Sequence, residues 1–164
     1  MILYHGTNQD IEYIDLKRGL KYKDFGQGFY TTLDIETAKR MARKRAKFFG
    51  GTPIVIVYEI DESVLAESGM NILRFPEKAT AEWITFVNKN RDRKSNTTFH
   101  GYDIIIGPIA DDGVVLQLNR FRDSILTPAE AAIALQDRFL DQQFYFGTEA
   151  SLKLLTKKDI CLIK

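Results

Sequence analysis

The stretch DFGQGFYTT at positions 24–32 restricts the fold more than any other part of the sequence. Gly26 and Gly28 allow a tight turn and a close approach to another segment, because glycine has no side chain. Two aromatic residues follow, and two β-branched threonines then favour an extended strand. We therefore predict a glycine-rich turn that places Tyr30 at the start of a short strand.

The segment YHGT at positions 4–7 is the second feature of this kind. It ends an apolar beginning, so we predict a first strand over residues 2–5 with His5 at its end. Residues 8–23 are polar with scattered apolar anchors, which indicates a loop. We expect the first strand and the glycine-rich turn to form two walls of one cleft, and the loop 8–23 to cover it.

Composition places the chain among ordinary globular proteins. Its 164 residues, 45% of them hydrophobic, are enough for one compact domain over 1–164. The net charge of +1 gives no global field for nucleic acid or an anionic membrane. Cys161 is the single cysteine and only two histidines occur, which excludes an internal disulfide and disfavours a metal site. We see neither a bilayer-length apolar run nor a signal-peptide pattern, and expect a cytoplasmic protein without a membrane partner.

Periodicity and capping residues predict a mixture of helices and strands. Thr127 precedes a proline and, three residues on, a glutamate, which is the pattern of a capping box. Residues 114–118 have the composition of a strand, but apolar spacing continues to residue 125 with a helical period, so we predict a helix. The elements do not alternate strictly, which favours the α+β class over a doubly wound parallel sheet. We expect helices over 35–49, 79–90, 114–125, 127–138 and 148–155, and strands over 2–5, 53–60, 71–75, 102–108, 143–146 and 159–163, with a polar loop over 91–100.

Common catalytic and nucleotide-binding signatures are missing from the sequence. It contains no HExxH and no GxSxG, the patterns of zinc peptidases and of many serine hydrolases. The Gly26–Gly28 segment lacks the third glycine and the preceding strand of a dinucleotide fingerprint. It also lacks the Lys-Ser/Thr pair of a P-loop. The two predicted cleft motifs are therefore the main candidates for chemistry.

Those motifs, YHGT at 4–7 and FGQGFY at 25–30, together resemble the ADP-ribosyltransferase fold of the His-Tyr-Glu type. That type includes diphtheria-toxin-like and poly(ADP-ribose) polymerase-like domains. The segment DQQFYF at 141–146 is similar to its third motif, an acidic residue opening a late strand. The whole chain also resembles small bacterial members of this superfamily, through EW at 82–83, NR at 90–91 and YDIIIGP at 102–108. The resemblance implies a split β core with peripheral helices, and NAD as the substrate.

The resemblance also implies roles for individual residues. His5 would hydrogen-bond the adenosine ribose of NAD, since imidazole can donate to or accept from a hydroxyl. The Gly6 backbone would hold the nicotinamide carboxamide, and Tyr30 would stack on the nicotinamide ring. The catalytic residues would be His5, Tyr30 and Gln143. The implied NAD site further contains Thr7, Gly28 and Phe29.

Departures from the family's pattern bear on the pocket and on catalysis. Ala38 and Met41 stand where relatives carry a serine and a second tyrosine, which alters the nicotinamide pocket. Gln143 aligns with the catalytic glutamate, whose carboxylate would stabilise an oxocarbenium-like state. Losing one such electrostatic partner costs about 3 kcal/mol, or roughly 100- to 1000-fold in rate. We expect slow turnover unless Asp141, Glu149 or a group of the substrate takes the place of the missing carboxylate.

Three hypotheses on function follow. The first is mono-ADP-ribosyl transfer or NAD cleavage by a bacterial toxin or effector, with an unidentified acceptor and an antitoxin-like protein partner. The second is a module that binds NAD or ADP-ribose without turnover, which the glutamine favours. The third is transfer of an RNA 2′-phosphate onto NAD, a reaction housed on a related fold that needs basic residues at the cleft.

Two further features have a structural and a functional interpretation. Six of the nine residues 39–47 are basic, and a solvated helix face explains most of them, with nucleic acid or phosphate binding as the alternative. Trp83 has helical spacing with Phe86 and Val87. This spacing indicates a core position rather than a cofactor contact.

Overall fold

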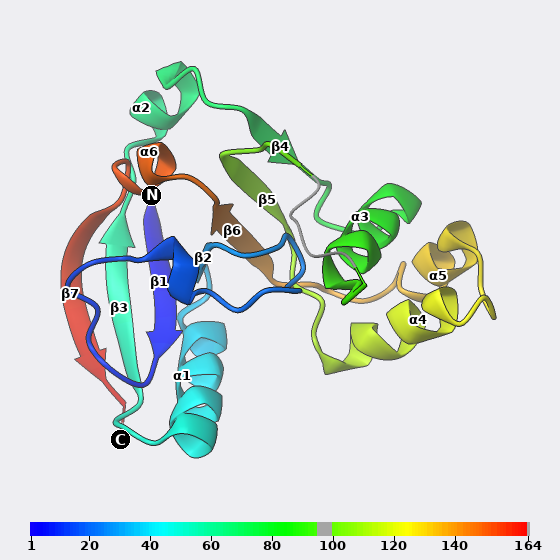
Figure 1. Ribbon diagram of the computed structural model, residues 1–164, viewed down its shortest axis with the longest axis horizontal. Coiled ribbons are helices and arrows are strands. Elements are labelled where there is room, and N and C mark those ends of the chain that lie inside the picture. Colours follow the sequence, from blue (N-terminus) through cyan, green and yellow to red (C-terminus); the bar gives the residue numbers. More distant parts are fainter. Residues whose placement is uncertain (95–99, 164) are drawn as a thin grey trace.

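The computed structural model describes residues 1–94 and 100–163, whose strands form one mixed seven-stranded sheet (Figure 1). The strand order is β4-β5-β6-β2-β1-β3-β7. Neighbouring strands are antiparallel except for β4 and β5, which are parallel. The strands are β1 (Ile2–Thr7), β2 (Phe29–Thr32), β3 (Ile54–Glu59), β4 (Ile72–Arg74), β5 (Ile104–Pro108), β6 (Gln142–Phe146) and β7 (Thr156–Leu162).

Helices surround this sheet, and the mixture agrees with the predicted α+β class. The segment with an ambiguous pattern, 114–125, is helical up to Arg122 in α4, so the helical period outweighed the local strand composition. The capping box at Thr127 is also present. Within the described residues the helices are α1 (Ile35–Phe49), α2 (Glu62–Glu67), α3 (Ala81–Arg91), α4 (Asp112–Arg122), α5 (Pro128–Ala134) and α6 (Glu149–Leu152), with a 3-10 turn η1 (Leu16–Arg18) in the loop 8–23.

The structure differs from the predicted elements mainly at short segments. Helix α2 was not predicted, because its six residues are too few to show a helical period. Helices α4, α5 and α6 each end three or four residues earlier than expected. Strand β7 begins at Thr156 rather than at residue 159, because its pairing with β3 continues to Glu59. Residues 95–99 of the predicted loop 91–100 lie outside the described residues.

The sheet divides between β1 and β2. These strands share a single register pair, Tyr4 with Thr32, whereas β1 pairs with β3 over six positions. In Figure 1, β7, β3 and β1 stand together on the left, and β6, β5 and β4 lie to their right. The two halves therefore separate next to His5, on one of the motifs singled out in the sequence.

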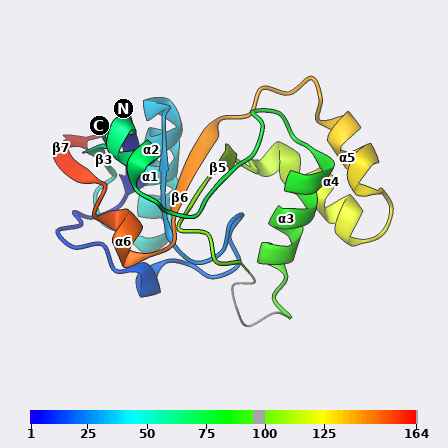
Figure 2. The ribbon, with the colours of Figure 1, turned by 90° about the horizontal axis from the view of Figure 1, so that it is seen from above.

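Two hydrophobic clusters hold the layers together. One joins Phe25 and Tyr145 to α3, α4 and α5, and Trp83 is fully buried within it, as its spacing predicted. The other lies around Leu3, Phe29 and the inner residues of β3, and Ile11, Ile14 and Leu16 of the loop 8–23 pack against it. Figure 2 shows α3, α4 and α5 gathered at the end of the molecule away from β7 and β3. Among the described helices, none is both long and apolar enough to cross a bilayer.

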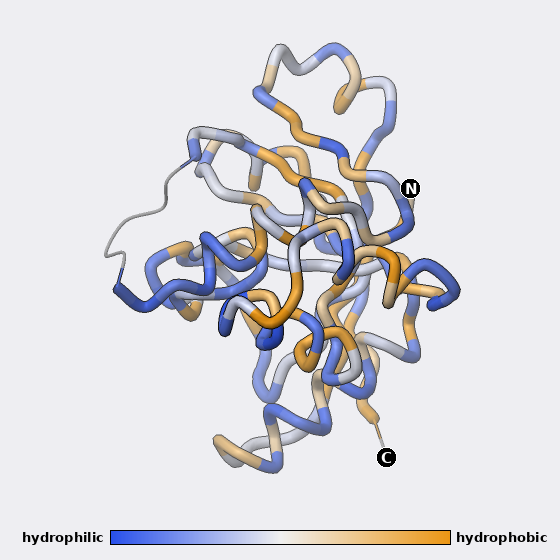
Figure 3. The backbone as a smooth tube through the Cα atoms, turned by 90° about the vertical axis from the view of Figure 1, so that its right-hand side faces the viewer, coloured by the Kyte–Doolittle hydropathy of each residue, from blue (hydrophilic) through white to orange (hydrophobic). Residues whose placement is uncertain are grey.

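Helix α1 packs directly on β1 and β3. Asp34 begins it by accepting the backbone N–H groups of Glu36 and Thr37, as a helix N-cap does. In Figure 3 hydrophobic stretches run through the middle of the tube, and many of the outer stretches are hydrophilic. Because side chains alternate along a strand, β1 turns Leu3, His5 and Thr7 to one face and presents Gly6 to α1 on the other.

Candidate functional site

A cavity of about 330 Å³ lies where β1 and β2 separate, beneath the loop 8–23. Its walls come from both motifs and from the loop, as the sequence predicted for a cleft. Five of the eight residues expected to bind NAD line it, together with several loop residues. These five are His5, Thr7, Gly28, Phe29 and Tyr30.

His5 links the two motifs. Its Nδ1 lies 2.6 Å from the backbone oxygen of Tyr30, and its ring stacks on Phe29 with the ring centroids 4.4 Å apart. Because a carbonyl oxygen only accepts, Nδ1 carries the proton and donates it. In the neutral ring Nε2 is then left as an acceptor. His5 is therefore set to accept a hydrogen bond from a ligand hydroxyl.

The surroundings keep His5 neutral at physiological pH. Burial, opposed in part by the Tyr30 carbonyl and aided by the charges of Lys23 and Arg45, lowers the pKa of His5 from 6.5 to about 4. In the unfolded chain the His5 imidazole becomes protonated near pH 6.5, whereas in the folded chain it becomes protonated only near pH 4. The contribution of His5 to stability is thus fully present above pH 6.5 and is lost as the pH falls from 6.5 to 4.

We expect His5→Asn to reduce the acid sensitivity of the fold. Asparagine can still donate to the Tyr30 carbonyl but does not titrate in this range. Between pH 7 and pH 4 the wild type should lose up to about 3 kcal/mol more free energy of unfolding than the variant. Urea denaturation of both proteins at each pH measures this difference. Equal losses in the two proteins would contradict the effect assigned to His5.

Tyr30 closes the glycine-rich turn on itself. Its hydroxyl donates to the Gly26 carbonyl at 2.6 Å and accepts the Phe25 N–H at 3.1 Å. Gly26 has φ of 90°, a conformation that favours glycine. A Cβ on Gly28 would lie 2.2 Å from the Tyr145 ring, so the turn also needs glycine to approach β6. Burial raises the pKa of Tyr30 well above its ordinary range, so its hydroxyl stays protonated and structural.

Lys23 makes a cation–π contact with one face of the Tyr30 ring. The Lys23 ammonium lies 3.9 Å from the ring centroid, and Lys23 lines the same cavity. Burial lowers the pKa of Lys23 from 10.5 to about 8, with further lowering by Arg45 and Arg91 and an opposing effect of Asp24. A ring stacked on this face of Tyr30 has to move the lysine aside.

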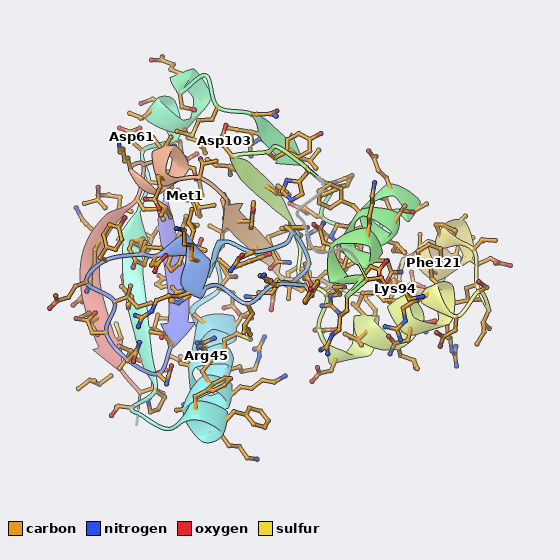
Figure 4. The ribbon with its side chains drawn as sticks, viewed as in Figure 1. Met1, Arg45, Asp61, Lys94, Asp103 and Phe121 are labelled. Carbon is orange, nitrogen blue, oxygen red and sulfur yellow. The ribbon has the colours of Figure 1, made fainter. Side chains whose placement is uncertain are left out.

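The cavity is electropositive. Arg18, Lys23 and Arg45 line it, against one acidic residue among the described lining residues, Asp15, whose carboxylate caps η1. Arg45 comes from α1 (Figure 4). Its Nε is buried and makes no hydrogen bond within the part of the chain that the structure describes. A buried unpaired donor is costly, so this nitrogen favours an anionic ligand oxygen.

Arg45 and Lys23 were not named as site residues from the sequence. Arg45 had a visible signal: it is a charged residue at a position where the helical spacing of α1 calls for an apolar one. Lys23 had none, because it belongs to a polar loop. Of the other basic residues of 39–47, Lys39, Arg40 and Lys44 form ion pairs with Glu36, Asp141 and Asp112 away from the cavity.

Gln143 lies outside this cavity, in a buried polar network. Its Nε2 donates to Asp24 Oδ2 at 2.7 Å and to the Pro108 carbonyl at 3.0 Å. Asp24 also accepts Arg91 Nε at 2.9 Å and the Ala110 N–H at 3.0 Å. The Gln143 side chain therefore fastens the residue before the glycine-rich turn to β5 and α3.

The two acidic residues considered as substitutes also have other partners. Asp141 accepts hydrogen bonds from Thr37 and Arg40, which ties β6 to the first turn of α1. Glu149 is exposed and accepts the Tyr13 hydroxyl at 3.3 Å. Tyr13 lines the cavity, so Glu149 reaches it only through this loop residue.

Three predicted NAD-binding residues lie elsewhere in the described structure. Gly6 faces α1, where a Cβ would lie 2.0 Å from the Ala38 carbonyl oxygen. Ala38 is buried in this contact, and Met41 is 45% exposed on the same helix. Close packing of α1 on β1 therefore explains Gly6 and Ala38 without a ligand. Their role toward NAD stays a prediction.

Comparison with known proteins gives one match. The model of a family described as "Protein of unknown function (DUF3990)" matches residues 1–156. This span contains the whole cavity and Gln143, and it ends at the first residue of β7. No curated protein and no solved structure matches the chain significantly. By its sequence over nearly its full length, the chain belongs to the DUF3990 family.

Proposed function

We propose that the chain is an NAD-binding domain of the ADP-ribosyltransferase type, which cleaves the nicotinamide–ribose bond and transfers a single ADP-ribose group. The observation that carries the proposal is the placement of His5 and Tyr30 on one electropositive cavity. The division of the sheet between β1 and β2 supports the split core that the resemblance implies. The acceptor, a toxin or effector role and an antitoxin-like partner stay predictions from that resemblance.

The cavity offers partners for a ribose, the nicotinamide ring and the pyrophosphate of NAD. The free acceptor Nε2 of His5 suits a ribose hydroxyl, and the face of Tyr30 suits the nicotinamide ring. Arg18 and the Nε of Arg45, which has no partner in the described part of the chain, suit the pyrophosphate, because guanidinium groups bind phosphate oxygens with charge-assisted hydrogen bonds. Aromatic side chains beside cationic ones suit a dinucleotide, which has both rings and phosphates, better than a neutral metabolite.

We expect the proposed transfer to be slow, because the described residues that line the cavity offer no carboxylate free to act as the catalytic acid. Gln143 carries no charge and is held by Asp24, and Asp15 is engaged in capping η1. The developing positive charge on the ribose therefore receives little electrostatic stabilisation. We therefore expect the transfer to be roughly 100- to 1000-fold slower than at a site with a catalytic carboxylate.

A second candidate is a module that binds NAD or ADP-ribose without cleaving it. The observation that favours it is the burial of Gln143, 6% exposed, in a network that serves the fold. The third hypothesis, RNA 2′-phosphate transfer, needs basic residues at the cleft. Arg18, Lys23 and Arg45 supply some, and a steep salt dependence of RNA binding would support that reaction.

We expect calorimetric titration with NAD to show binding, and Arg45→Gln to weaken it roughly 10- to 100-fold, the value of a hydrogen bond to a charged group. Arg43→Gln is the matched control, because Arg43 is exposed on the same helix and does not line the cavity. Free nicotinamide, measured chromatographically, reports cleavage. Binding of NAD without nicotinamide release would favour the binding module over the transferase. If NAD did not bind, both hypotheses would be wrong.

A further inference from the structure

Lys23 stands beside the position where the proposed ligand reacts. Its ammonium lies 3.9 Å from the centroid of the Tyr30 ring, the ring on which the nicotinamide would stack. It lines the same cavity as His5 and Arg45. The C1′ carbon of the ribose is bonded directly to the nicotinamide ring nitrogen. A ring on Tyr30 therefore brings this carbon close to the Lys23 amine.

We propose that Lys23 is itself an acceptor, and that the protein attaches ADP-ribose to this side chain. The proposal rests on the proposed function, because it uses NAD bound in the same cavity. It names the substrate class of the acceptor, a primary amine within the protein, which the sequence left open.

The flexible lysine side chain can make room for the ligand and stay within reach. Lys23 has four rotatable methylene groups, so its amine can leave the face of Tyr30 without any backbone movement. Reacting atoms need to come within about 3–3.5 Å of each other for productive attack. A nicotinamide ring stacked on Tyr30 would displace the amine by about the thickness of one aromatic ring, which is similar to this reaction distance. The displaced amine therefore remains near C1′, at the edge of the nicotinamide ring.

The electrostatic surroundings supply a nucleophilic amine. With a pKa lowered to about 8, chiefly by burial, a fraction of Lys23 is neutral at pH 7, far more than for an exposed lysine. His5 stays neutral and Tyr30 stays protonated across the same range, because burial moves the pKa of each away from it. Asp24 raises the pKa of Lys23, whereas Arg45 and Arg91 lower it, and the charged residues Asp15 and Arg18 line the same cavity.

The step balances without another reactant. The lone pair of the neutral Lys23 amine forms a bond to C1′ of NAD. The bond between C1′ and the nicotinamide nitrogen breaks, and its electron pair neutralises the pyridinium, so that nicotinamide leaves uncharged. The new secondary ammonium releases one proton to water. No oxidant, reductant or metal is needed.

The test is incubation of the whole protein with NAD at pH 8, followed by intact mass measurement and peptide mapping. We expect an added mass of one ADP-ribose group on Lys23. Lys23→Arg, which keeps the positive charge but is a poor nucleophile, should abolish this label. Lys21→Arg is the matched control, because Lys21 is exposed on the same loop and does not line the cavity. It should leave the label unchanged, and thermal melting verifies that both variants fold.

A second readout is the pH dependence of labelling. The rate should rise about tenfold per pH unit between pH 6 and 7 and level off above pH 8, following the neutral amine. Incubation with free ADP-ribose instead of NAD controls for non-enzymatic sugar addition, which should fall on exposed lysines rather than on Lys23.

The outcomes separate this proposal from the function on which it rests. Nicotinamide release with the label on other residues, or with none, would overturn the role of Lys23 and leave the transferase intact. Binding of NAD without nicotinamide release would overturn both. A label on Lys23 that free ADP-ribose reproduces would also overturn the proposal, because the bond would then not arise from NAD.

Discussion

Gln143→Glu is expected to destabilise the protein by about 4 kcal/mol at pH 7 rather than to restore a catalytic acid. In the wild type the Gln143 amide donates to Asp24 at 2.7 Å, with both side chains buried. A glutamate would place a second carboxylate at this distance. Burial and the like charge would raise the pKa of the new glutamate well above its unfolded value. Urea denaturation at pH 7 measures the loss.

The pH dependence identifies the cause of this loss. Because the folded pKa of the introduced glutamate is raised, its cost should be small below about pH 4 and should grow as the pH rises. The double variant Asp24→Asn/Gln143→Glu removes the like charge and should recover part of the lost stability. The recovery should be incomplete, because Arg91 loses its ion pair with the Asp24 carboxylate. A single variant that is as stable as the wild type and releases nicotinamide at least tenfold faster would show that Gln143 does occupy a catalytic position.

Gly6→Ala is expected to destabilise the fold by at least about 3 kcal/mol, the upper range for overpacking a close contact. The added Cβ would lie 2.0 Å from the Ala38 carbonyl oxygen and 2.9 Å from the Ala42 backbone nitrogen. Both atoms belong to the backbone of α1, so no side chain can turn away to make room. Helix α1 would have to withdraw from β1. Thermal or urea unfolding without ligand measures the effect.

Gly101→Ala is the matched control for this substitution. A Cβ at Gly101 meets no atom within 4 Å, and its backbone does not need glycine. It should therefore change the free energy of unfolding by less than about 0.5 kcal/mol, as surface substitutions usually do. If Gly6→Ala were equally harmless to stability but removed NAD binding, Gly6 would serve the ligand rather than the packing of α1.

The sequence contained strong local signals for most elements. The capping box at Thr127, the N-cap at Asp34 and the helical spacing over 114–125 each involve neighbours within a few turns, and the structure confirms all three helices. The short helix α2 lacked such a signal because six residues do not complete two turns. Local patterns therefore predicted which segments are helices and strands, but not their pairing order in the sheet.

For the candidate site, too, some residues were predicted from local sequence patterns and others were found only in the structure. The sequence predicted that His5 and Tyr30 share one cleft, because both residues lie where a strand meets a segment that contains glycine. The positions of Arg45 and Gln143 in the structure depend on contacts between segments far apart in the chain, and Lys23 reaches Tyr30 only through the folding of the turn between them. Only the folded structure brings Lys23 over Tyr30, and Arg45 of α1 to the cavity.

The sequence by itself thus determined the glycine-rich turn and the strand that carries Tyr30, since steric freedom and β-propensity act within a few residues. The tertiary structure alone decided what surrounds that tyrosine. It placed a lysine on the ring, lined the same cavity with an arginine whose Nε has no partner among the described residues, and hydrogen-bonded Gln143 to Asp24. The physical reason is that burial, charge and hydrogen-bond partners are properties of the packed chain, which no single segment contains.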